Sequence, residues 1–424
     1  MVINMKYISR LIDKKITAKL KTSGAVLITG PKFCGKTTTC KQHAKTIHSF
    51  STKKNIDLYS IDYRSALIGE TPVLIDEWQN IPEIWDEIRE DVDNRGETGQ
   101  FLLTGSISKL NHDEIIHSGV GRFSRIVMYP FSLYESNESN GLVSIKELFE
   151  NKEYKIFNPT PNGSLSDVAF YICRGGWPTA INIEKEYALD VSANYLDGVI
   201  NYKSKDEKNY FPRPKIAELL VKSYARHIST QASLTTIMKD IKENNNTTMD
   251  DETFSNYLEK LYSLFIIEDI QSWNPNLRSK ATIRTTPTRH FIDSSIATQA
   301  LGISPNDLLN DLNSFGLFFE DMCIRDLKVY SDAIGGKVYH YRDSDNLEID
   351  AVIHLKNGKW GAFEIKLGGE KLINEGIKSL KKLYNKIDYS KFNTPEFLAV
   401  ITATGPCYKT KDGIYIIPIT MLKD

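Results

Sequence analysis

The stretch GPKFCGKTTTC at residues 30–40 decides how the first third of the chain is interpreted. Four residues separate its two glycines, and the second of them, Gly35, is followed by Lys36 and Thr37. Glycines let the backbone bend until its N–H groups point at phosphate oxygens, and a lysine and a threonine at this spacing serve the outer phosphates and Mg²⁺. A surface turn with a solvated lysine matches the same short pattern, so the flanking sequence has to decide.

The flanking residues favour the phosphate-binding interpretation. The run GAVLITG at 24–30 is apolar and rich in β-branched residues, and it predicts a buried strand. Residues 36–50 are expected to form one helix, whose amino end adds partial positive charge. Strand, glycine loop and helix follow in the order that phosphate binding requires. The expected nucleotide-contacting residues are Gly30, Pro31, Lys32, Phe33, Cys34, Gly35, Lys36, Thr37 and Thr38.

A second apolar run, PVLIDEWQN at 72–80, ends in two acidic residues, Asp76 and Glu77. A carboxylate at a strand end beside the loop holds the water shell of Mg²⁺, and its neighbour orients and deprotonates an attacking water. An acidic turn of an ordinary α/β protein is the alternative, which two motifs in this order disfavour. We therefore expect Lys36 and Glu77 to be catalytic, and Thr37 and Asp76 to serve Mg²⁺.

Further strands are expected at 56–62, 99–106 and 124–132, which together predict a parallel sheet with crossover helices. The run at 99–106 ends in Thr104, Gly105 and Ser106. Additional-strand ATPases carry a polar residue here that senses the γ-phosphate, and Thr104 is expected to take this role. Arg122, in the run GVGRF, is a candidate for a catalytic contact with the γ-phosphate of its own or a neighbouring subunit. An ordinary salt-bridging arginine is the alternative.

The middle of the chain is expected to contain a connector and then a winged helix-turn-helix. Gly and Pro residues around Trp177 predict a rigid turn with an aromatic plug, which we interpret as structural. Three helical segments and a candidate hairpin follow it. In this interpretation basic residues of the hairpin meet nucleic-acid phosphates, whereas the alternative is a module that only packs on its neighbours. The basic residues are Arg278, Lys280, Arg284 and Arg289.

The last third combines carboxylates with a lysine. Residues 338–369 predict three strands with tight turns. Glu364 and Lys366 are two apart on one strand and face the same side, and the neighbouring strand can bring Asp350 level with them. Asp350 and Glu364 would chelate Mg²⁺ and Lys366 would support phosphodiester cleavage, with Glu320 of an upstream helix as a further ligand. A buried Asp–Lys–Glu network without catalysis is the alternative.

The overall composition constrains partners and compartment. The chain has 424 residues, which predicts two or three domains, and 41% hydrophobic and 25% charged residues, as in ordinary globular proteins. Its formal net charge of −1 gives no general attraction to nucleic acid, so such binding would be local. Five cysteines without paired spacing indicate reduced thiols in a cytoplasmic protein, and no apolar run predicts a membrane span.

Taken together, these motifs resemble a family of prokaryotic AAA-type ATPases with a C-terminal domain of unknown function related to PD-(D/E)XK nucleases. The resemblance runs nearly end to end through GPKFCGKTT, LIDEWQNIPEIW, FLLTGS, GVGRF, GGWPTA, GLFFEDMCIRDL, YRDSDNLEIDAVI and GAFEIKLGG. The stretch between the expected strands at 56–62 and 72–80 is short compared with many members. The resemblance implies ATPase residues at Lys36, Thr37, Asp76, Glu77 and Thr104, and nuclease-like residues at Glu320, Asp350, Glu364 and Lys366.

The predicted fold class is α/β: an additional-strand, AAA-like P-loop NTPase sheet, then a winged helix-turn-helix, then a restriction-endonuclease-like domain. The predicted function is ATP binding and hydrolysis coupled to a nuclease-like module acting at DNA, with ATP and Mg²⁺ as cofactors. The alternatives are a nucleotide-switched regulatory protein with an inactive nuclease fold and a signalling ATPase that binds only proteins. Homo-oligomerisation is left open. The predicted boundaries are 1–135 for the ATPase domain, 136–195 for the connector, 196–290 for the winged helix and 291–424 for the nuclease-like domain.

Overall fold

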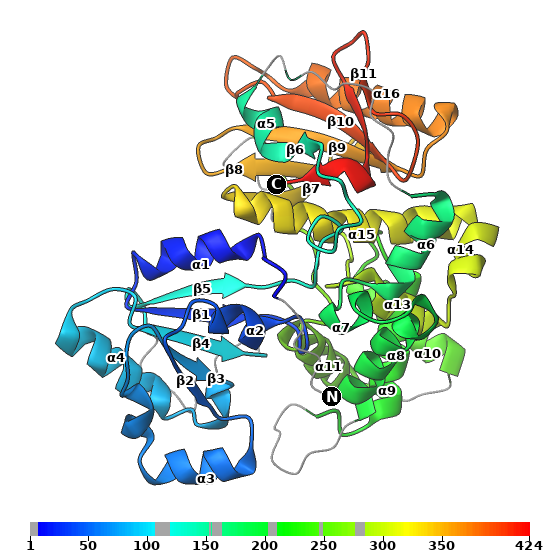
Figure 1. The fold of residues 1–424 in the computed structure, drawn as a ribbon. Coiled ribbons are helices and arrows are strands. Elements are labelled where there is room, and N and C mark those ends of the chain that lie inside the picture. Colours follow the sequence, from blue (N-terminus) through cyan, green and yellow to red (C-terminus); the bar gives the residue numbers. More distant parts are fainter. Residues whose placement is uncertain are drawn as a thin grey trace. The chain divides into compact units, whose positions relative to one another are not determined.

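The computed structural model describes residues 7–106, 119–151, 154, 163–201, 210–245, 249–275 and 285–424. The chain divides into two compact units (Figure 1). The first contains Met1–Pro130 and Tyr262–Phe265, and the second contains Phe131–Leu261 and Ile266–Asp424. None of the helices in the described ranges combines the length and apolarity needed to span a bilayer.

The first unit is built on a five-stranded sheet in the order β2-β3-β4-β1-β5, with every neighbouring pair parallel. The predicted parallel sheet is therefore confirmed, and β4 lies between the strand before the glycine loop and the strand that ends in Asp76. The strands are β1 (Ala25–Thr29), β2 (Thr46–Ser49), β3 (Val73–Asp76), β4 (Phe101–Gly105) and β5 (Phe123–Val127). The helices are α1 (Ile12–Leu20), α2 (Lys36–Lys41), α3 (Lys53–Ile61) and α4 (Ile84–Arg95), with 3₁₀ turns at Tyr63–Leu67 and Trp78–Asn80.

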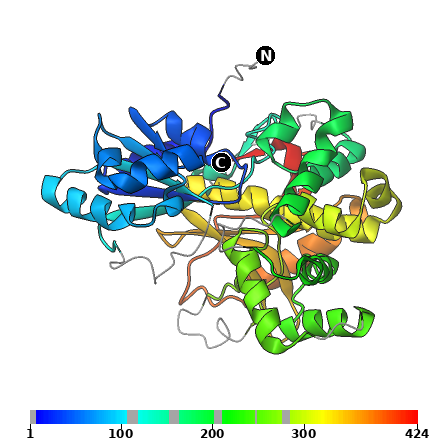
Figure 2. The same ribbon diagram turned by 90° about the horizontal axis from the view of Figure 1, so that it is seen from below.

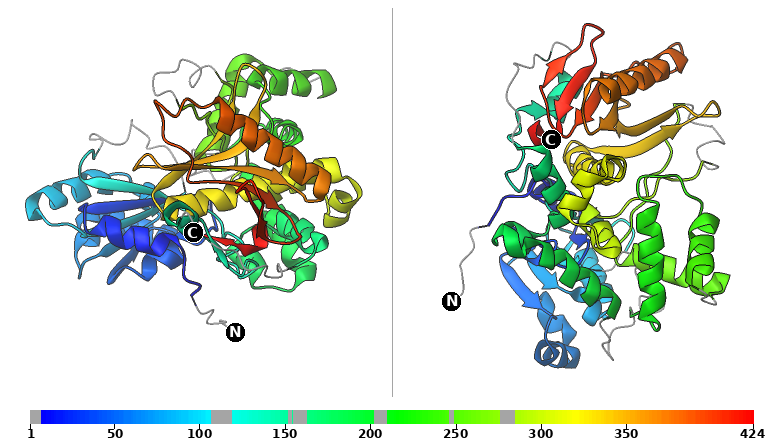
Figure 3. Two further views of the ribbon diagram at one scale, coloured as in Figure 1. Left: turned by 90° about the horizontal axis from the view of Figure 1, so that it is seen from above. Right: turned by 90° about the vertical axis from the view of Figure 1, so that its right-hand side faces the viewer.

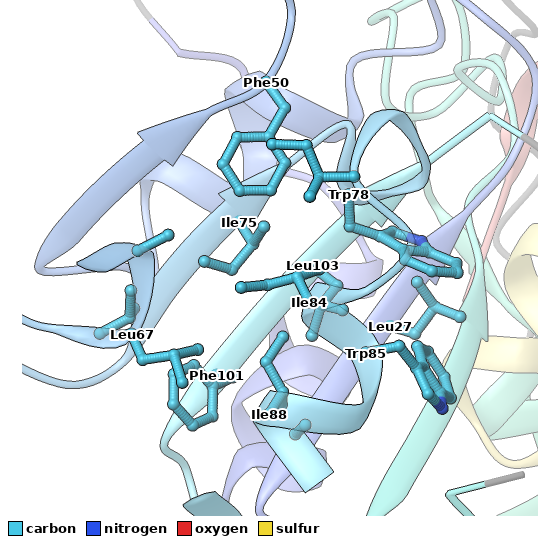
Figure 4. Close-up of a cluster of buried hydrophobic side chains, with 14 of the residues drawn as sticks. Leu27, Phe50, Leu67, Ile75, Trp78, Ile84, Trp85, Ile88, Phe101 and Leu103 are labelled. Carbon is cyan, nitrogen blue, oxygen red and sulfur yellow. The ribbon is translucent and has the colours of Figure 1, made fainter. Parts of the chain in front are cut away.

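Both faces of this sheet are covered, which explains why its central strands are apolar at nearly every position. Figure 4 shows the cluster on one face, where side chains from α4 and the neighbouring turn meet those of β1, β3 and β4. Trp85 stacks on Phe123 with ring centroids 3.9 Å apart, and Trp78 lies 5.0 Å from Trp85. Full burial of each large apolar side chain contributes about 1.5–3 kcal/mol. The cluster on the other face includes Ile16, Val26, Ile28, Leu74, Leu102, Ile126 and Met128.

Two predicted elements of the first unit are wrong. The expected strand at 56–62 lies mainly in helix α3, and the edge strand is β2, inside the expected helix at 36–50. Helix α2 ends after Lys41, and Thr46–Ser49 pair in parallel register with β3. Helix α3 begins where the Thr52 hydroxyl accepts a hydrogen bond from the backbone N–H of Asn55. The pairing of β2 with β3 makes residues 46–49 a strand, and the Thr52 cap starts a helix at Lys53. The sequence periodicity of these segments did not distinguish helix from strand.

The second unit contains a six-stranded mixed sheet in the order β11-β12-β10-β9-β8-β7. Strands β7, β8 and β9 are antiparallel neighbours, whereas β10 is parallel to both β9 and β12. Figures 1 and 3 show α15 and α16 on opposite faces of this sheet. The elements are α15 (Leu312–Ala333), β7 (Gly336–Arg342), β8 (Glu348–Leu355), β9 (Trp360–Lys366), α16 (Glu370–Lys386), β10 (Phe397–Thr402), β11 (Tyr408–Lys409) and β12 (Tyr415–Pro418).

Helices make up the rest of the second unit, drawn mostly in green in Figure 2. The segment expected as a connector, 136–195, instead carries helices and the short strand β6, which pairs with β13. Helices α9, α10 and α11 precede antiparallel bridges that join Ile267 to Phe291 and Ile270 to Thr288. A winged helix and the domain boundaries stay predictions. The elements are β6 (Val143–Ser144), α5 (Ile145–Glu150), α6 (Leu165–Arg174), α7 (Pro178–Ile181), α8 (Lys185–Asn201), α9 (Pro214–Arg226), α10 (Leu234–Asn245), α11 (Asp251–Ser263), α13 (Ser294–Leu301), α14 (Pro305–Asn310) and β13 (Leu422–Lys423).

The turn around Trp177 is held by a buried carboxylate. Asp293 accepts hydrogen bonds from the backbone N–H of Gly176 at 2.9 Å and from Arg325 at 2.8 Å. Trp177 is buried, and its indole N–H donates to the Ser295 hydroxyl at 2.9 Å. Because a buried charge needs both a partner and hydrogen bonds, this network fixes the turn against α13 and α15. The structural interpretation of the turn agrees with these contacts.

Gly176→Ala should destabilise the second unit by about 2–4 kcal/mol, because a Cβ there would lie 2.1 Å from the carbonyl oxygen of Phe131. Gly198→Ala is the matched control, since the exposed helical Gly198 has open space around its Cβ position and should gain about 0.5–1 kcal/mol. Urea denaturation followed by circular dichroism measures both. Equal midpoints for the two variants would contradict this account of the turn.

Candidate functional site

The loop after β1 depends on its glycines. Gly30 has φ of 155°, and a Cβ there would lie 2.2 Å from the carbonyl oxygen of Met128. Gly35 caps α2 with φ of 101°, in the left-handed region that glycine tolerates. Among the expected loop residues, Phe33 and Thr38 are exposed, whereas Pro31, Cys34 and Lys36 are buried.

Lys36 lies inside the curve of the loop. Its side chain is buried, with 4% of the residue exposed. Its ammonium donates to the carbonyl oxygens of Gly30 at 3.1 Å and Pro31 at 2.8 Å. The loop thus holds a positive charge next to the amino end of α2, where backbone N–H groups also favour an anion.

Asp76 joins the loop to two strands of the sheet. One of its carboxylate oxygens, Oδ1, accepts hydrogen bonds from the hydroxyls of Thr37 at 2.6 Å and Thr104 at 2.7 Å. Its other oxygen, Oδ2, accepts from the Ser49 hydroxyl at 3.2 Å. Thr37, Asp76 and Thr104 come from α2, β3 and β4, so the sheet brings together three residues that the sequence had singled out. Ser49 was missed, because its segment had been predicted as a helix.

Glu77 follows Asp76 in a constrained conformation. Its φ of 57° lies in the left-handed region, which is uncommon for a residue with a side chain. Its backbone N–H donates to the Thr104 hydroxyl at 3.1 Å, and its carboxylate accepts from the side-chain amide of Gln79. These contacts fix the direction of the Glu77 side chain beside the Asp76 junction, and such strain is typical of functional sites.

Residues 22–137 match the family model of an AAA domain. The match covers the glycine loop, Asp76, Glu77 and Thr104, and it supports an AAA-type ATPase family and nucleotide binding for this part of the chain. Residues 165–307 and 315–422 match two family models described as domains of unknown function.

Two curated mycobacterial proteins are similar to most of the chain. An uncharacterized protein of Mycobacterium bovis and one of Mycobacterium tuberculosis are each 22% identical over 375 residues, covering 86% of this chain and 75% of theirs. Among solved structures, one of Drosophila ORC bound to DNA aligns with 71% of this chain and 89% of that chain at 9% identity. Its TM-score is 0.18, so this likeness carries no argument.

Arg10, which sequence reasoning missed, supports the loop from the N-terminal segment. Its buried guanidinium donates to the carbonyl oxygens of Cys34 at 3.1 Å and Tyr129 at 2.8 Å. Cys34 belongs to the loop, and Tyr129 follows β5. The only sequence signal was an arginine shortly before an amphipathic helix, which on its own predicts a solvated side chain.

Arg122 lies at the amino ends of the parallel strands, whereas the glycine loop of its own chain follows the carboxyl end of β1. It immediately precedes β5, and its carbonyl oxygen accepts from the N–H of Ala25, at the start of β1. Because β1 and β5 are parallel, the loop is at their other end. The Arg122 guanidinium forms an exposed ion pair with Asp93 at 2.8 Å. The structure therefore does not bring Arg122 to the loop of its own chain, and its contact with a γ-phosphate, in its own or a neighbouring subunit, stays a prediction.

One basic residue of the expected hairpin is unavailable to nucleic acid. Arg289 is 4% exposed and forms an ion pair with Asp269. It cannot meet a phosphate while it is buried. Arg278, Lys280 and Arg284 lie outside the described residues.

The second unit gathers the predicted carboxylates around one lysine. Lys366, at the end of β9, places its ammonium 3.0 Å from Asp350 Oδ2 and 2.7 Å from Glu364 Oε2. Asp350 also accepts from the backbone N–H of Ile365 at 2.7 Å. Strand β8 brings Asp350 level with Glu364, since the preceding pair in the register is Ala351 with Phe363. The expected alignment of the three residues is present.

Burial and charge repulsion make this cluster sensitive to protons. Glu364 is 3% exposed, and burial together with the negative charge of Asp350 raises the pKa of Glu364 to about 8. Burial and the same neighbour also raise the pKa of Glu320, which α15 carries, well above its usual range. Burial alone would lower the pKa of Lys366, but Asp350 and Glu364 raise it. Two carboxyl groups thus contact one ammonium, and a third carboxyl group, that of Glu320, interacts electrostatically with them.

The predicted set of metal ligands is not assembled in the second unit. Among the described residues, no group of three or more His, Cys, Asp or Glu side chains is arranged to hold a metal ion. The ammonium of Lys366 contacts both Asp350 and Glu364, which is the place that a cation would need. The cluster in this state is therefore a buried ion network of Lys366 with Asp350 and Glu364. The raised pKa of the nearby Glu320 favours its protonated, neutral form.

Stability should fall as the pH rises from about 5 to about 9. The pKa of Glu364 is higher in the folded protein than in the unfolded chain, so the folded state binds the proton more tightly and loses this advantage as pH passes about 8. Glu320 acts in the same direction. Glu364→Gln should flatten the profile by on the order of a few kcal/mol. Asp412→Asn is the control, because the Asp412 side chain is exposed and pairs with Lys381 away from the cluster. Urea titrations across this pH range would contradict the account if Glu364→Gln and Asp412→Asn both kept the wild-type slope.

Proposed function

We propose that this protein binds and hydrolyses ATP at the loop between β1 and α2. The observation that carries the proposal is the shared oxygen of Asp76, on which the hydroxyls of Thr37 and Thr104 converge. It links the loop, the acidic strand end and the strand between them, as nucleotide hydrolysis at a P-loop requires. The AAA domain match over residues 22–137 supports the same proposal.

Each residue of the site has a role in this proposal. Lys36 and the backbone N–H groups at the start of α2 bind the β- and γ-phosphates. Thr37 and Asp76 would hold Mg²⁺, since their hydroxyl and carboxylate oxygens lie 2.6 Å apart and are the donors this ion prefers. When bound, Mg²⁺ neutralises charge on the phosphates. Glu77 orients and deprotonates the attacking water, and Thr104 senses the γ-phosphate.

Lys36→Ala should abolish ATP binding, because the charge and hydrogen bonds to the phosphates disappear together. Glu77→Gln should bind ATP with nearly wild-type affinity and lose turnover by about 10²–10⁴-fold, the range for loss of a general base. Lys45→Ala, which removes an exposed lysine paired with Glu70, should change neither. Calorimetry measures binding, and phosphate release measures turnover. Equal ATP affinity for wild type and Lys36→Ala would overturn the loop's role.

We further propose that the ATPase is coupled to phosphodiester cleavage by the second unit, with DNA as the substrate class. The order α15-β7-β8-β9-α16-β10 supports this, because it resembles the expected nuclease-like core. So does the approach of Lys366 to Asp350 and Glu364. The two carboxylates would hold Mg²⁺, which when bound activates water and polarises the phosphate. Lys366 supplies positive charge where the transition state gains negative charge.

A second candidate is a nucleotide-switched regulatory protein whose second unit binds DNA or protein without cleaving it. The ion network favours it, since Lys366 already neutralises Asp350 and Glu364. In such a network, removing either partner leaves a buried charge uncompensated, at a cost of about 3–5 kcal/mol.

Mn²⁺ separates the two candidates. If the second unit is a nuclease, Mn²⁺ should raise the melting temperature of wild type, because an ion bound only to the folded state adds RT ln(1 + [L]/Kd). Asp350→Asn should lose this shift and keep the one caused by ATP. Lys366→Ala should keep the Mn²⁺ shift and lose plasmid nicking. Equal large losses of stability in both variants, with no Mn²⁺ response or nicking in wild type, would establish the regulatory alternative.

A further inference from the structure

A cavity of about 270 Å³ lies where the amino end of α16 meets the end of β10. It is lined by main chain and hydroxyl groups on one side and by apolar side chains on the other. Neither the glycine loop nor the ion network accounts for it. Its polar lining includes Gly369, Asn374, Thr402, Thr404 and Gly405, and its apolar wall includes Ile373, Pro406 and Tyr408.

Thr402 lines this cavity and carries an unsatisfied hydroxyl. The residue is 1% exposed, and its Oγ1 has no hydrogen-bond partner within the described part of the chain. A buried hydroxyl normally finds a partner, because leaving it unpaired forfeits the hydrogen bonds it made to water. A ligand of the cavity that reached this hydroxyl would supply the missing partner.

The amino end of α16 faces the same cavity. This helix has 17 residues, and its N-cap, Gly369, makes no side-chain hydrogen bond to the first turn. The first N–H groups of a helix have no partner within the helix, and together with the helix dipole they favour an anion. Glu370 also lines the cavity, but its side chain is exposed, so solvent screens its charge.

The register of the sheet puts this cavity beside the carboxylate–lysine cluster. Thr402 pairs with Lys366, and Val400 pairs with Glu364, in the parallel ladder of β9 and β10. Paired residues of neighbouring strands point to the same face, so the Thr402 hydroxyl and the Lys366 ammonium share one face of the sheet. A Cβ at Gly376 would lie 3.1 Å from Glu364 Cβ, which shows that α16 covers this face.

We propose that this cavity binds a phosphate group of a nucleic-acid strand next to the Asp350–Glu364–Lys366 cluster. The inference rests on the proposed nuclease-like function and names its substrate-positioning site. A phosphate fits because the polar wall offers N–H and O–H donors, and the apolar wall suits the face of a sugar. Thr402 is a positioning residue, since it orients the strand and takes no part in bond breaking.

Binding of a fluorescent single-stranded oligonucleotide, followed by anisotropy in Ca²⁺, tests the proposal. All proteins carry Lys36→Ala, so that the glycine loop does not bind the probes. Thr402→Val keeps the shape and removes the hydroxyl, and it should weaken binding about tenfold, the loss expected for one hydrogen bond to a charged group. Thr402→Ser restores the hydroxyl and should stay within about twofold of the parent.

Thr420→Val is the matched control. Thr420 is fully buried and its Oγ1 also has no partner within the described residues, but it does not line the cavity. The two valine variants should therefore resemble each other in unliganded stability and differ in oligonucleotide binding. A similar loss of binding in both would assign the effect to general repacking and overturn the proposal.

Competition with inorganic phosphate and a nucleoside monophosphate identifies the source of the phosphate. Displacement of the oligonucleotide by another oligonucleotide, and only weakly by the small anions, supports a strand. Binding of the small anions without oligonucleotide binding overturns the proposal of a nucleic-acid strand. An oligonucleotide affinity of Thr402→Val equal to that of the parent also overturns it. If Thr402→Val binds more weakly while the parent cuts no plasmid in Mn²⁺, the phosphate site stands and the nuclease activity fails. If the parent cuts plasmid and Thr402→Val cuts it with an unchanged KM, the nuclease activity stands and the phosphate site fails.

Discussion

The hydrogen bonds to Asp76 organise the first unit. A buried carboxylate is stable only when its oxygens are satisfied, and here the donors come from α2, β2 and β4. This requirement sets the relative positions of the glycine loop and the strands around it. Glu77 then follows in its left-handed conformation because Thr104, which donates to Asp76, also accepts from the Glu77 backbone. Asp76 Oδ1 and the Thr104 hydroxyl oxygen together therefore couple the glycine loop to the residue proposed to activate water.

Buried carboxylates have different partners in the two units. In the first unit, neutral hydroxyls surround Asp76, so a cation can still gain from approaching that carboxylate. In the second unit, Lys366 already contacts Asp350 and Glu364. One ammonium does not neutralise two buried carboxylates, and burial and the charge of Asp350 raise the pKa of Glu364. A divalent ion there must compete with an ammonium or with protons. An aspartate surrounded by hydroxyls and an aspartate paired with a lysine thus differ in how much a cation could gain by approaching them.

Structure could be predicted from the sequence wherever phosphate binding or burial constrains several consecutive residues. Gly35, Asp76 and the apolar runs around them identified the loop and the parallel sheet, and the alternation along β8 and β9 brought Asp350 to Glu364. Prediction failed where partners are distant: Thr46–Ser49 becomes a strand only because β3 lies beside it. The sequence around Arg122 and Arg289 did not indicate their ion pairs with Asp93 and Asp269, which lie 20 or more residues away in the chain. Thr402 could not have been found, because a missing hydrogen bond is a property of packing.

Strands β6 and β13 join residues 143–144 to residues 422–423 within one small sheet. During synthesis, at roughly 5–20 residues per second, the first partner waits roughly 15–60 s for the second. Until then Val143 has no strand to pair with, and the Ser139 hydroxyl lacks the Leu422 carbonyl oxygen to which it donates. The sheet of the first unit ends at Val127 and meets no such delay. Folding is therefore expected to be sequential on the ribosome, because the parallel sheet of the first unit can form well before the second unit closes.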